Sequence, residues 1–174
     1  MRNTPSLEPG TATATATATR DTLRAVLGQF ATGVTVVSAG RDLPQGMTAN
    51  SYTSVSLDPP LVLVCVARTA ALHTTVLAER HFAVSILRSG QDHVARYFAD
   101  RHRPRGPGAF DTIDAFTGRA TGAPLLTGAL AWLECSLAAV YDGGDHSILL
   151  GEVRDLARGT PGEPLTYFAG AFRP

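Results

Sequence analysis

The sequence has no net charge, few cysteines and no long apolar run. Because its formal net charge is +0, it has no overall positive field to hold nucleic acid or an anionic membrane surface. Its apolar runs are far too short to cross a bilayer, which takes roughly 20 consecutive apolar residues. The sequence therefore predicts a protein with neither a nucleic-acid nor a membrane partner.

Cysteine is scarce as well, with two residues in the chain. Cys65 and Cys135 lie in apolar, strand-like runs, so we expect two buried thiols in a reducing compartment and no disulfide. The sequence contains no H-x-H, HExxH or CxxC spacing, so no metal site is expected. It also lacks the G-x-S-x-G turn of serine hydrolases and the GxGxxG turn of doubly wound dinucleotide-binding folds.

The length of 174 residues suits one domain, and the 44% hydrophobic and 17% charged residues are ordinary for a globular protein. Residues 11–19 have the sequence TATATATAT. Because the methyl groups of alanine and threonine cannot offset the entropy of ordering such a chain, residues 1–20 are predicted to be a disordered tail before a folded domain at 21–174. The tail lacks the apolar middle of a secretory signal, which predicts a cytoplasmic protein.

Hydrophobic periodicity predicts three helices. Asp21 is expected to cap the first, in which Leu23, Val26, Leu27 and Phe30 lie along one side. A second helix is predicted over 70–79, capped by Thr69, and a third over 91–99. The inward-facing side chains are predicted to be Leu72, Val76 and Leu77 in the second helix, and Val94, Ala95 and Phe98 in the third.

Strands outnumber helices in the prediction. They are expected over residues 34–38, 61–66, 82–87, 130–141, 147–153 and 165–172. The run 61–66 is apolar without alternation, so both of its faces are expected to be covered. The tight turn Gly143-Gly144-Asp145 predicts a hairpin. Strands joined by hairpins favour a mainly antiparallel barrel with a few packed helices.

The chain is organised around residues 46–60, GMTANSYTSVSLDPP, which are rich in small residues and hydroxyls. In an extended chain alternate side chains face opposite ways, and neither set here is apolar enough for an ordinary core strand. Small side chains let a flat polar ligand approach the backbone, and the hydroxyl and amide groups add donors and acceptors. The alternative is a polar edge strand that ends in a double-proline turn. The arginine- and proline-rich segment 100–108 is interpreted as a solvated loop, with a phosphate contact as the alternative.

The stretch GMTANSYTSVSLDPPLV resembles the signature of the flavin reductase-like family, the NAD(P)H:flavin oxidoreductases with an FMN-binding split barrel. Further segments resemble that family in the same order, over roughly residues 21–173. They are 30–37, 81–87, 91–99, 122–126, 133–135, 144–146 and 151–153. The resemblance implies a mainly β fold with a few helices, a split β-barrel of antiparallel, Greek-key-like topology. It also implies a homodimer that holds the flavin near the subunit interface.

The same resemblance implies the residues of the site. The ring of the flavin is expected to contact Thr48, Ala49, Asn50 and Ser51, and its ribityl chain Ser54 and Ser56. The phosphate is expected at the N-terminus of the helix after residue 69, where unpaired N–H groups favour an anion. Its side-chain contacts are expected to be Arg68, Thr69 and Thr74, although Thr69 could serve as a helix cap alone.

Gly144-Asp145-His146 resembles the family's GDH motif, in which the histidine lies close to the bound nicotinamide. His146 is therefore the expected catalytic residue, which positions NADH or NADPH; the alternative is a solvated turn residue. The implied function is reduction of FMN or FAD and supply of the reduced flavin to a partner monooxygenase, such as one of secondary metabolism. Two alternatives use the same pocket: a flavin-dependent biosynthetic enzyme that retains its flavin, and a non-enzymatic flavin-binding protein.

Overall fold

The computed structural model describes residues 19–173. The predicted disordered tail lies outside the described residues, except for its last two positions, and stays a prediction. Arg20 begins the first helix, α1 (Arg20–Leu27), and Thr19 directly precedes it. The Thr19 hydroxyl accepts a hydrogen bond from the Thr22 N–H. Thr19 is therefore the cap, and the expected cap at Asp21 is wrong.

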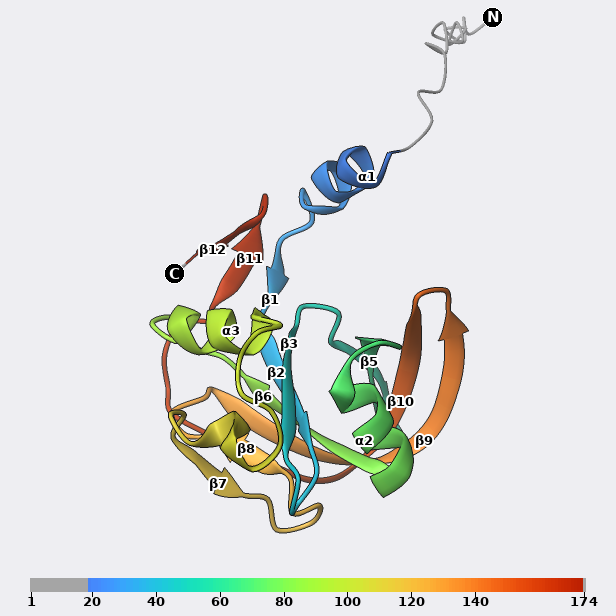
Figure 1. Ribbon diagram of the computed structural model, residues 1–174, viewed down its shortest axis with the longest axis vertical. Helices are drawn as coiled ribbons and strands as arrows, with labels where there is room; N and C mark the ends of the chain where they lie inside the picture. The colour runs from blue at the N-terminus through green and yellow to red at the C-terminus, as the bar shows by residue number, and fades with distance from the viewer. Residues whose placement is uncertain (1–18, 174) are drawn as a thin grey trace, which may run out of the picture.

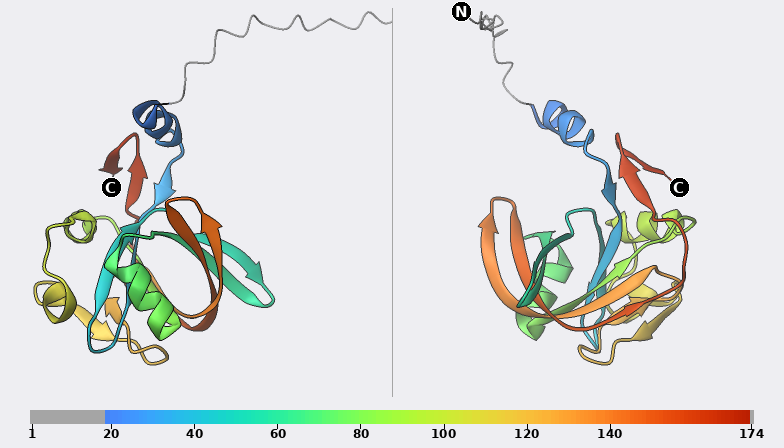
Figure 2. Two further views of the ribbon diagram at one scale, coloured as in Figure 1. Left: turned by 45° about the vertical axis from the view of Figure 1, so that its right-hand side comes forward. Right: turned by 180° about the vertical axis from the view of Figure 1, so that it is seen from behind.

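A curved antiparallel sheet of seven strands forms the body of the protein (Figures 1 and 2). In spatial order its strands are β3 (Gln45–Ala49), β2 (Thr35–Ala39), β6 (His81–Ile86), β9 (Ala131–Gly143), β10 (His146–Arg158), β5 (Pro60–Ala67) and β4 (Thr53–Leu57). The sheet curls until β3 approaches β5 again, but the two do not pair as neighbours in the ladder. The result is the mainly β, split-barrel architecture that was predicted.

Two smaller sheets flank this body. One consists of β1 (Thr32–Gly33), β11 (Thr166–Phe168) and β12 (Ala171–Arg173), and the other of β7 (Ala115–Thr117) and β8 (Pro124–Leu126). The single strand predicted over 165–172 is wrong, because Ala169 and Gly170 both have positive φ angles, of 49° and 81°, and turn the chain between β11 and β12. A short 3₁₀ helix, η1 (Gly106–Phe110), precedes β7.

Helices α2 (Ala71–Glu79) and α3 (Asp92–Ala99) pack against the curved sheet. Their inward side chains are largely those predicted: Leu72, Val76, Val94, Ala95 and Phe98 are buried, whereas Leu77 is exposed. Strand β5 differs from its prediction, because only its alternate residues Val62, Val64 and Val66 are buried. The other face of β5 is half-buried, since part of it borders the cavity described below. Within residues 19–173 no helix combines the length and apolar character needed to cross a membrane.

Helix α1 projects away from the sheet (Figures 1 and 2). The predicted apolar side is present, but no residue of α1 is buried. The exposed side chains are Leu23, Val26, Leu27 and, just beyond the helix, Phe30. Periodicity correctly identified an apolar face, but the described part of the chain does not cover it.

Both cysteines are free, as predicted. Cys135 is buried in the core, and burial together with the charge of Glu134 raises the pKa of its thiol to about 12. Cys65 is half-buried. The raised pKa keeps the Cys135 thiol protonated.

Strands β9 and β10 form the longest hairpin, joined by the predicted turn at Gly144-Asp145. A β-bulge interrupts their pairing between Leu150 and Gly151. A Cβ atom on Gly151 would lie 2.5 Å from the Phe82 ring and 2.9 Å from the Cβ atom of Cys135. The core at this point therefore has no space for a methyl group.

Replacing Gly151 with alanine should lower the free energy of unfolding by roughly 1–3 kcal/mol, the usual cost of overpacking a core. The measurement is urea denaturation followed by circular dichroism. Gly33→Ala is the matched control, because nothing lies within 4 Å of the added methyl group in that strand. Equal unfolding midpoints for the two variants would contradict this account of the core.

Candidate functional site

A cavity of about 570 Å³ lies beside the curved sheet, between β3 and the end of β5. Its walls come from β3 and the turn after it, the end of β5, the N-terminus of α2, the loop after α3, and His146. This volume lies within the range of small-molecule sites, about 300–1,000 Å³. Most of its wall consists of small or polar residues, as the sequence of the organising stretch predicts.

The predicted ring contacts Thr48, Ala49, Asn50 and Ser51 all line the cavity. Two of their hydroxyl groups hold the fold together. Thr48 Oγ1 donates to the Ala95 carbonyl at 2.6 Å, and Ser51 Oγ accepts from the Cys65 N–H at 3.0 Å. The first bond ties β3 to α3 and the second ties the turn after β3 to β5. Since these hydroxyls are engaged, backbone groups and Asn50 are the main polar groups that this wall offers to a ligand.

Gly46 begins the same wall, and its lack of a side chain is required. A Cβ atom at this position would lie 2.5 Å from the Phe98 ring. The ring therefore packs directly on the backbone of β3. The guanidinium carbon of Arg103 lies 5.5 Å from the centre of the same ring, and Arg103 Nη2 donates to the Gly46 carbonyl.

The N-terminus of α2 forms a second wall, through Thr69, Ala70 and Ala71. The expected cap at Thr69 is wrong: the N-cap is Ala70, and no side chain caps this helix. No side chain therefore accepts from the N–H groups of its first turn, and Ala71 and Leu72 of this turn line the cavity. Such a terminus has a partial positive charge and binds anions, most often phosphate.

Four of the predicted contacts lie outside the cavity wall. They are Ser54, Ser56, Arg68 and Thr74. Ser54 and Ser56 belong to β4, which lies at the edge of the sheet beyond β5. Thr74 is exposed on the first turns of α2. Arg68 follows β5 directly but points to a different partner.

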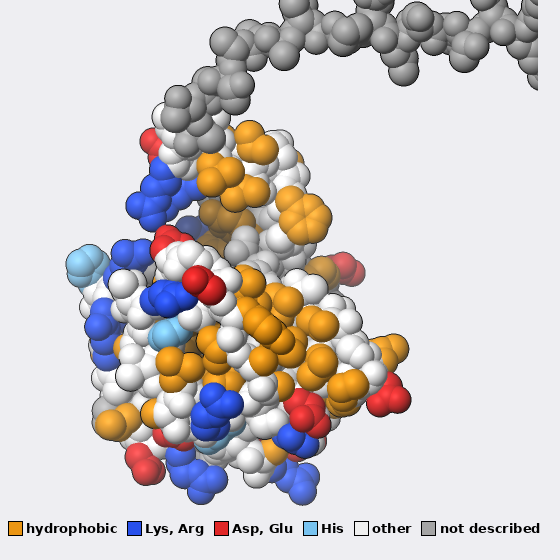
Figure 3. All heavy atoms as spheres, turned by 90° about the vertical axis from the view of Figure 1, so that its right-hand side faces the viewer, with side chains coloured by type: hydrophobic (Ala, Val, Ile, Leu, Met, Phe, Trp, Pro, Cys, Tyr) orange, Lys and Arg blue, Asp and Glu red, His pale blue; other side chains and the backbone are white. Residues whose placement is uncertain are grey.

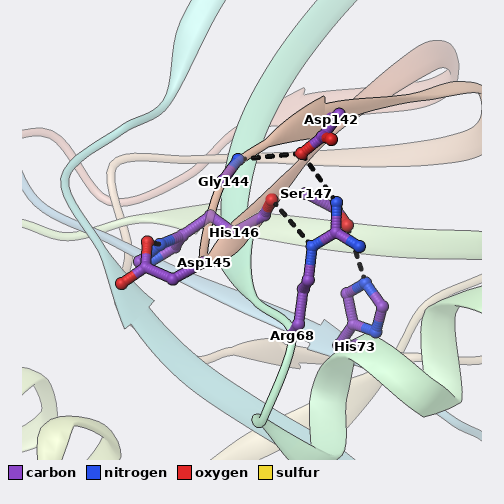
Figure 4. A network of polar contacts seen from close by, with 7 residues as sticks. All are labelled: Arg68, His73, Asp142, Gly144, Asp145, His146 and Ser147. Carbon is purple, nitrogen blue, oxygen red and sulfur yellow. Dashed lines mark hydrogen bonds and ion pairs between the residues drawn. The ribbon is translucent and has the colours of Figure 1, made fainter.

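Arg68 joins the end of β5 to the tip of the β9–β10 hairpin (Figure 4). Its Nη2 lies 2.8 Å from Oδ1 of Asp142, and its Nε donates to the His146 carbonyl at 3.3 Å. The same Asp142 oxygen accepts the Gly144 N–H at 2.9 Å. The Gly144 N–H and the Arg68 charge lower the pKa of Asp142. Arg68 therefore stabilises the hairpin tip rather than presenting its charge to the cavity.

His146 lies on the rim of the cavity as the first residue of β10. It is opposite Gly143 in β9 and Ala67 in β5, so its backbone is held on both sides. Its Nδ1 lies 2.6 Å from Oδ1 of Asp145, whose pKa is lowered by this hydrogen bond and by the charge of His146 (Figure 4). When Nδ1 carries the proton that Asp145 accepts, Nε2 of the neutral ring is left as an acceptor.

The loop after α3 contributes residues that the sequence analysis did not favour. Arg101, Arg103 and Arg105 line the cavity, although the segment was interpreted as a solvated loop. The signal that could have identified them is their spacing, since an extended chain places alternate residues on one side. Within residues 19–173 no group of three or more potential metal ligands is present.

A second cavity, of about 400 Å³, adjoins the first and shares Thr48, Asn50 and Ala99 with it. Tyr167 and Phe172 line it and pack edge to face, with ring centres 5.3 Å apart. The Arg96 guanidinium carbon lies 5.2 Å from the centre of the Phe172 ring. The two cavities together offer a polar site beside an aromatic one.

Comparison with known proteins places this site in a family. The model of the flavin reductase like domain matches residues 27–174. An NADH-dependent FAD reductase of Streptomyces globisporus is 52% identical over 151 residues, which are 87% of this chain and 83% of that protein. The reductase subunit HsaB of a flavin-dependent monooxygenase of Rhodococcus jostii is 37% identical over 150 residues, 86% of this chain and 74% of that one.

Among solved structures, BorF has a TM-score of 0.84 and 52% identity, covering 88% of this chain and 96% of its own. It is the flavin reductase component of a bacterial two-component tryptophan halogenase. The matched region contains the whole cavity, including the organising stretch and His146. The chain belongs to the flavin reductase-like family.

Proposed function

We propose that this protein transfers a hydride from NADH or NADPH to FMN or FAD and supplies the reduced flavin to a partner monooxygenase. One observation carries the proposal: a single cavity joins the Thr48–Ser51 wall, an uncapped helix N-terminus and His146. The relatives support it, because they include an NADH-dependent FAD reductase and a monooxygenase reductase subunit. They also favour a reductase over the two alternatives that share the pocket.

The walls of the cavity fit a flavin. A flavin needs hydrogen bonds at the polar edge of its ring, a flat wall and a site for its phosphate. The backbone of β3 and its turn offers the first two, and the N-terminus of α2 offers the third. When bound, the flavin supplies the hydride acceptor.

The residues of the chain bind and orient the reactants. Hydride transfer needs close approach and alignment of donor and acceptor rather than a protein base. His146 lies on the rim, where its ring can contact a nicotinamide placed over the ring of a flavin. Asp145 accepts the Nδ1 proton, and Arg68 fixes the backbone of His146, so the imidazole is held in one orientation.

A homodimer is part of the proposal. Its support is the apolar side of α1, where Leu23, Val26 and Leu27 are exposed, and Figure 3 shows hydrophobic side chains gathered in the upper part of this face. Burial of such side chains in a second copy would remove them from water. A cytoplasmic location is also proposed, since free thiols suit a reducing compartment.

His146→Ala should leave flavin affinity within about threefold and slow flavin reduction about ten- to a few hundredfold, which is roughly 1.4–3 kcal/mol of barrier. The reason is loss of orientation rather than loss of binding. Anaerobic single-turnover absorbance measurements give the reduction rate. His93→Ala is the control, because this exposed histidine on α3 lines neither cavity. Reduction at the parent's rate would remove His146 from the site.

Substitutions at Ala70 should separate helix capping from phosphate binding. Ala70→Ser and Ala70→Asp both supply the missing cap and should stabilise the protein by about 0.5–2 kcal/mol. The aspartate also repels a phosphate, so FMN should bind it about tenfold or more weakly, since a charge-assisted hydrogen bond is worth roughly 1.5–3 kcal/mol.

Riboflavin has no phosphate and should bind the Ala70→Asp variant as it binds the parent. The measurements are thermal unfolding without ligand and fluorescence titration with each flavin. If the aspartate variant bound FMN and riboflavin with parental affinities, the phosphate would not lie at α2.

Sedimentation at micromolar concentration should give about twice the chain mass of 18.3 kDa. Leu27→Glu with Phe30→Glu should shift the protein toward monomer, because both charges would have to be buried in the interface. Leu43→Glu is the control, as an exposed leucine in a loop away from α1. A dimer that persists in the double variant would exclude α1 from the interface.

A further inference from the structure

The loop after α3 gives one end of the cavity a positive charge. Arg101, Arg103 and Arg105 line this end beside Asp100, and His146 lies on the rim. This end of the cavity therefore has three positively charged guanidinium groups and one negatively charged carboxylate. The Asp100 carboxylate already accepts the His102 N–H at 2.8 Å, so it is held by its own loop.

These arginines bond to backbone carbonyls and not to acids. Arg105 Nη2 donates to the Arg101 carbonyl at 3.3 Å, and Arg103 Nη1 donates to the Asp100 carbonyl at 3.3 Å. Within residues 19–173 none of the three forms an ion pair. Other arginines of the chain do, as Arg68, Arg96 and Arg154 show.

Arg103 is the most constrained of the three. It is half-buried between the Phe98 ring and the Gly46 carbonyl, and its Nε is buried without a hydrogen-bond partner among the described residues. Burial lowers the pKa of this guanidinium. A partly desolvated charge without a counter-ion is unfavourable, and a bound anion offsets that cost.

The cavity therefore has two separate features that favour anions. One is the uncapped N-terminus of α2, and the other is the arginine loop, residues 101–105. A flavin mononucleotide has one phosphate group, which the proposed function places at α2. An adenine dinucleotide has a second phosphate, on the side of its adenosine, and the planar guanidinium group is the side chain best matched to phosphate oxygens.

We propose that Arg101, Arg103 and Arg105 form a second anion subsite that binds the adenosine-side phosphate of an adenine dinucleotide, supplied by FAD or by NAD(P)H. The inference rests on the proposed function in so far as the flavin phosphate occupies the α2 end. The exposed side chains of Arg101 and Arg105, at the mouth of the cavity, contact the phosphate. Arg103 contributes positive charge from within the wall.

ADP is a suitable probe, because it is the half that FAD and NADH share. Calorimetric titration should show ADP binding to the parent protein already saturated with FMN. In the double variant Arg101→Gln, Arg105→Gln this binding should weaken roughly ten- to hundredfold, the effect of losing charge-assisted contacts. Arg103 is left unchanged because it also supports β3. Arg158→Gln, at an exposed arginine that lines neither cavity, should bind ADP as the parent does.

Comparison of FAD, FMN and NADH identifies which dinucleotide supplies the phosphate. A loss of FAD affinity at constant FMN affinity in the double variant supports the subsite and assigns it to FAD. A raised KM for NADH with both flavin affinities constant supports it and assigns it to the nicotinamide nucleotide. Equal losses for FMN and FAD overturn the proposal, because the arginines would then hold the phosphate that both flavins have.

Absence of ADP binding to the parent, or equal binding to parent and double variant, also overturns the proposal. Thermal unfolding of both variants checks that the fold is intact. A parent that binds ADP beside FMN but does not reduce flavin supports the subsite and contradicts the proposed reductase. The two hypotheses thus fail on different measurements.

Discussion

The site depends on the pairing of β10 with both β9 and β5. This ladder holds His146 opposite Ala67, and α2 begins only four residues after Ala67. One register therefore brings the histidine and an uncapped helix N-terminus to the same opening. Arg68 lies between Ala67 and α2 in sequence and secures the arrangement through Asp142 and the His146 carbonyl. An exposed ion pair contributes little to stability, so its value lies in fixing position.

Local patterns predicted the elements well where a pattern has one structural outcome. The glycines before Asp145 specified the hairpin turn, and the helical spacing of Val94 and Phe98 specified the buried face of α3. Helix α1 shows the limit, because periodicity reveals an apolar face but not whether the same chain covers it. The last strand was misjudged because the apolar run continues across Gly170, whereas the backbone turns there.

The site was predictable in part for the same reason. The Thr48–Ser51 wall is contiguous in sequence, so its small and polar residues could be recognised together. Arg68 was expected at a phosphate, but its partner Asp142 lies 74 positions away and no local pattern reveals it. The arginine loop was undervalued because the path of a proline-rich loop depends on what it packs against. Here that surface is the ring of Phe98, a residue predicted only as core.

The contact between Gly46, Phe98 and Arg103 has a consequence for how such proteins diverge. A side chain at position 46 would displace the ring, and the ring supports the guanidinium group above it. The three positions therefore cannot vary independently: a larger residue in β3 requires a smaller one in α3, and that exchange removes the platform of the arginine. Inherited changes in the wall proposed for the flavin and in the loop proposed for the dinucleotide are thus coupled, so preferences for the two nucleotides should evolve together.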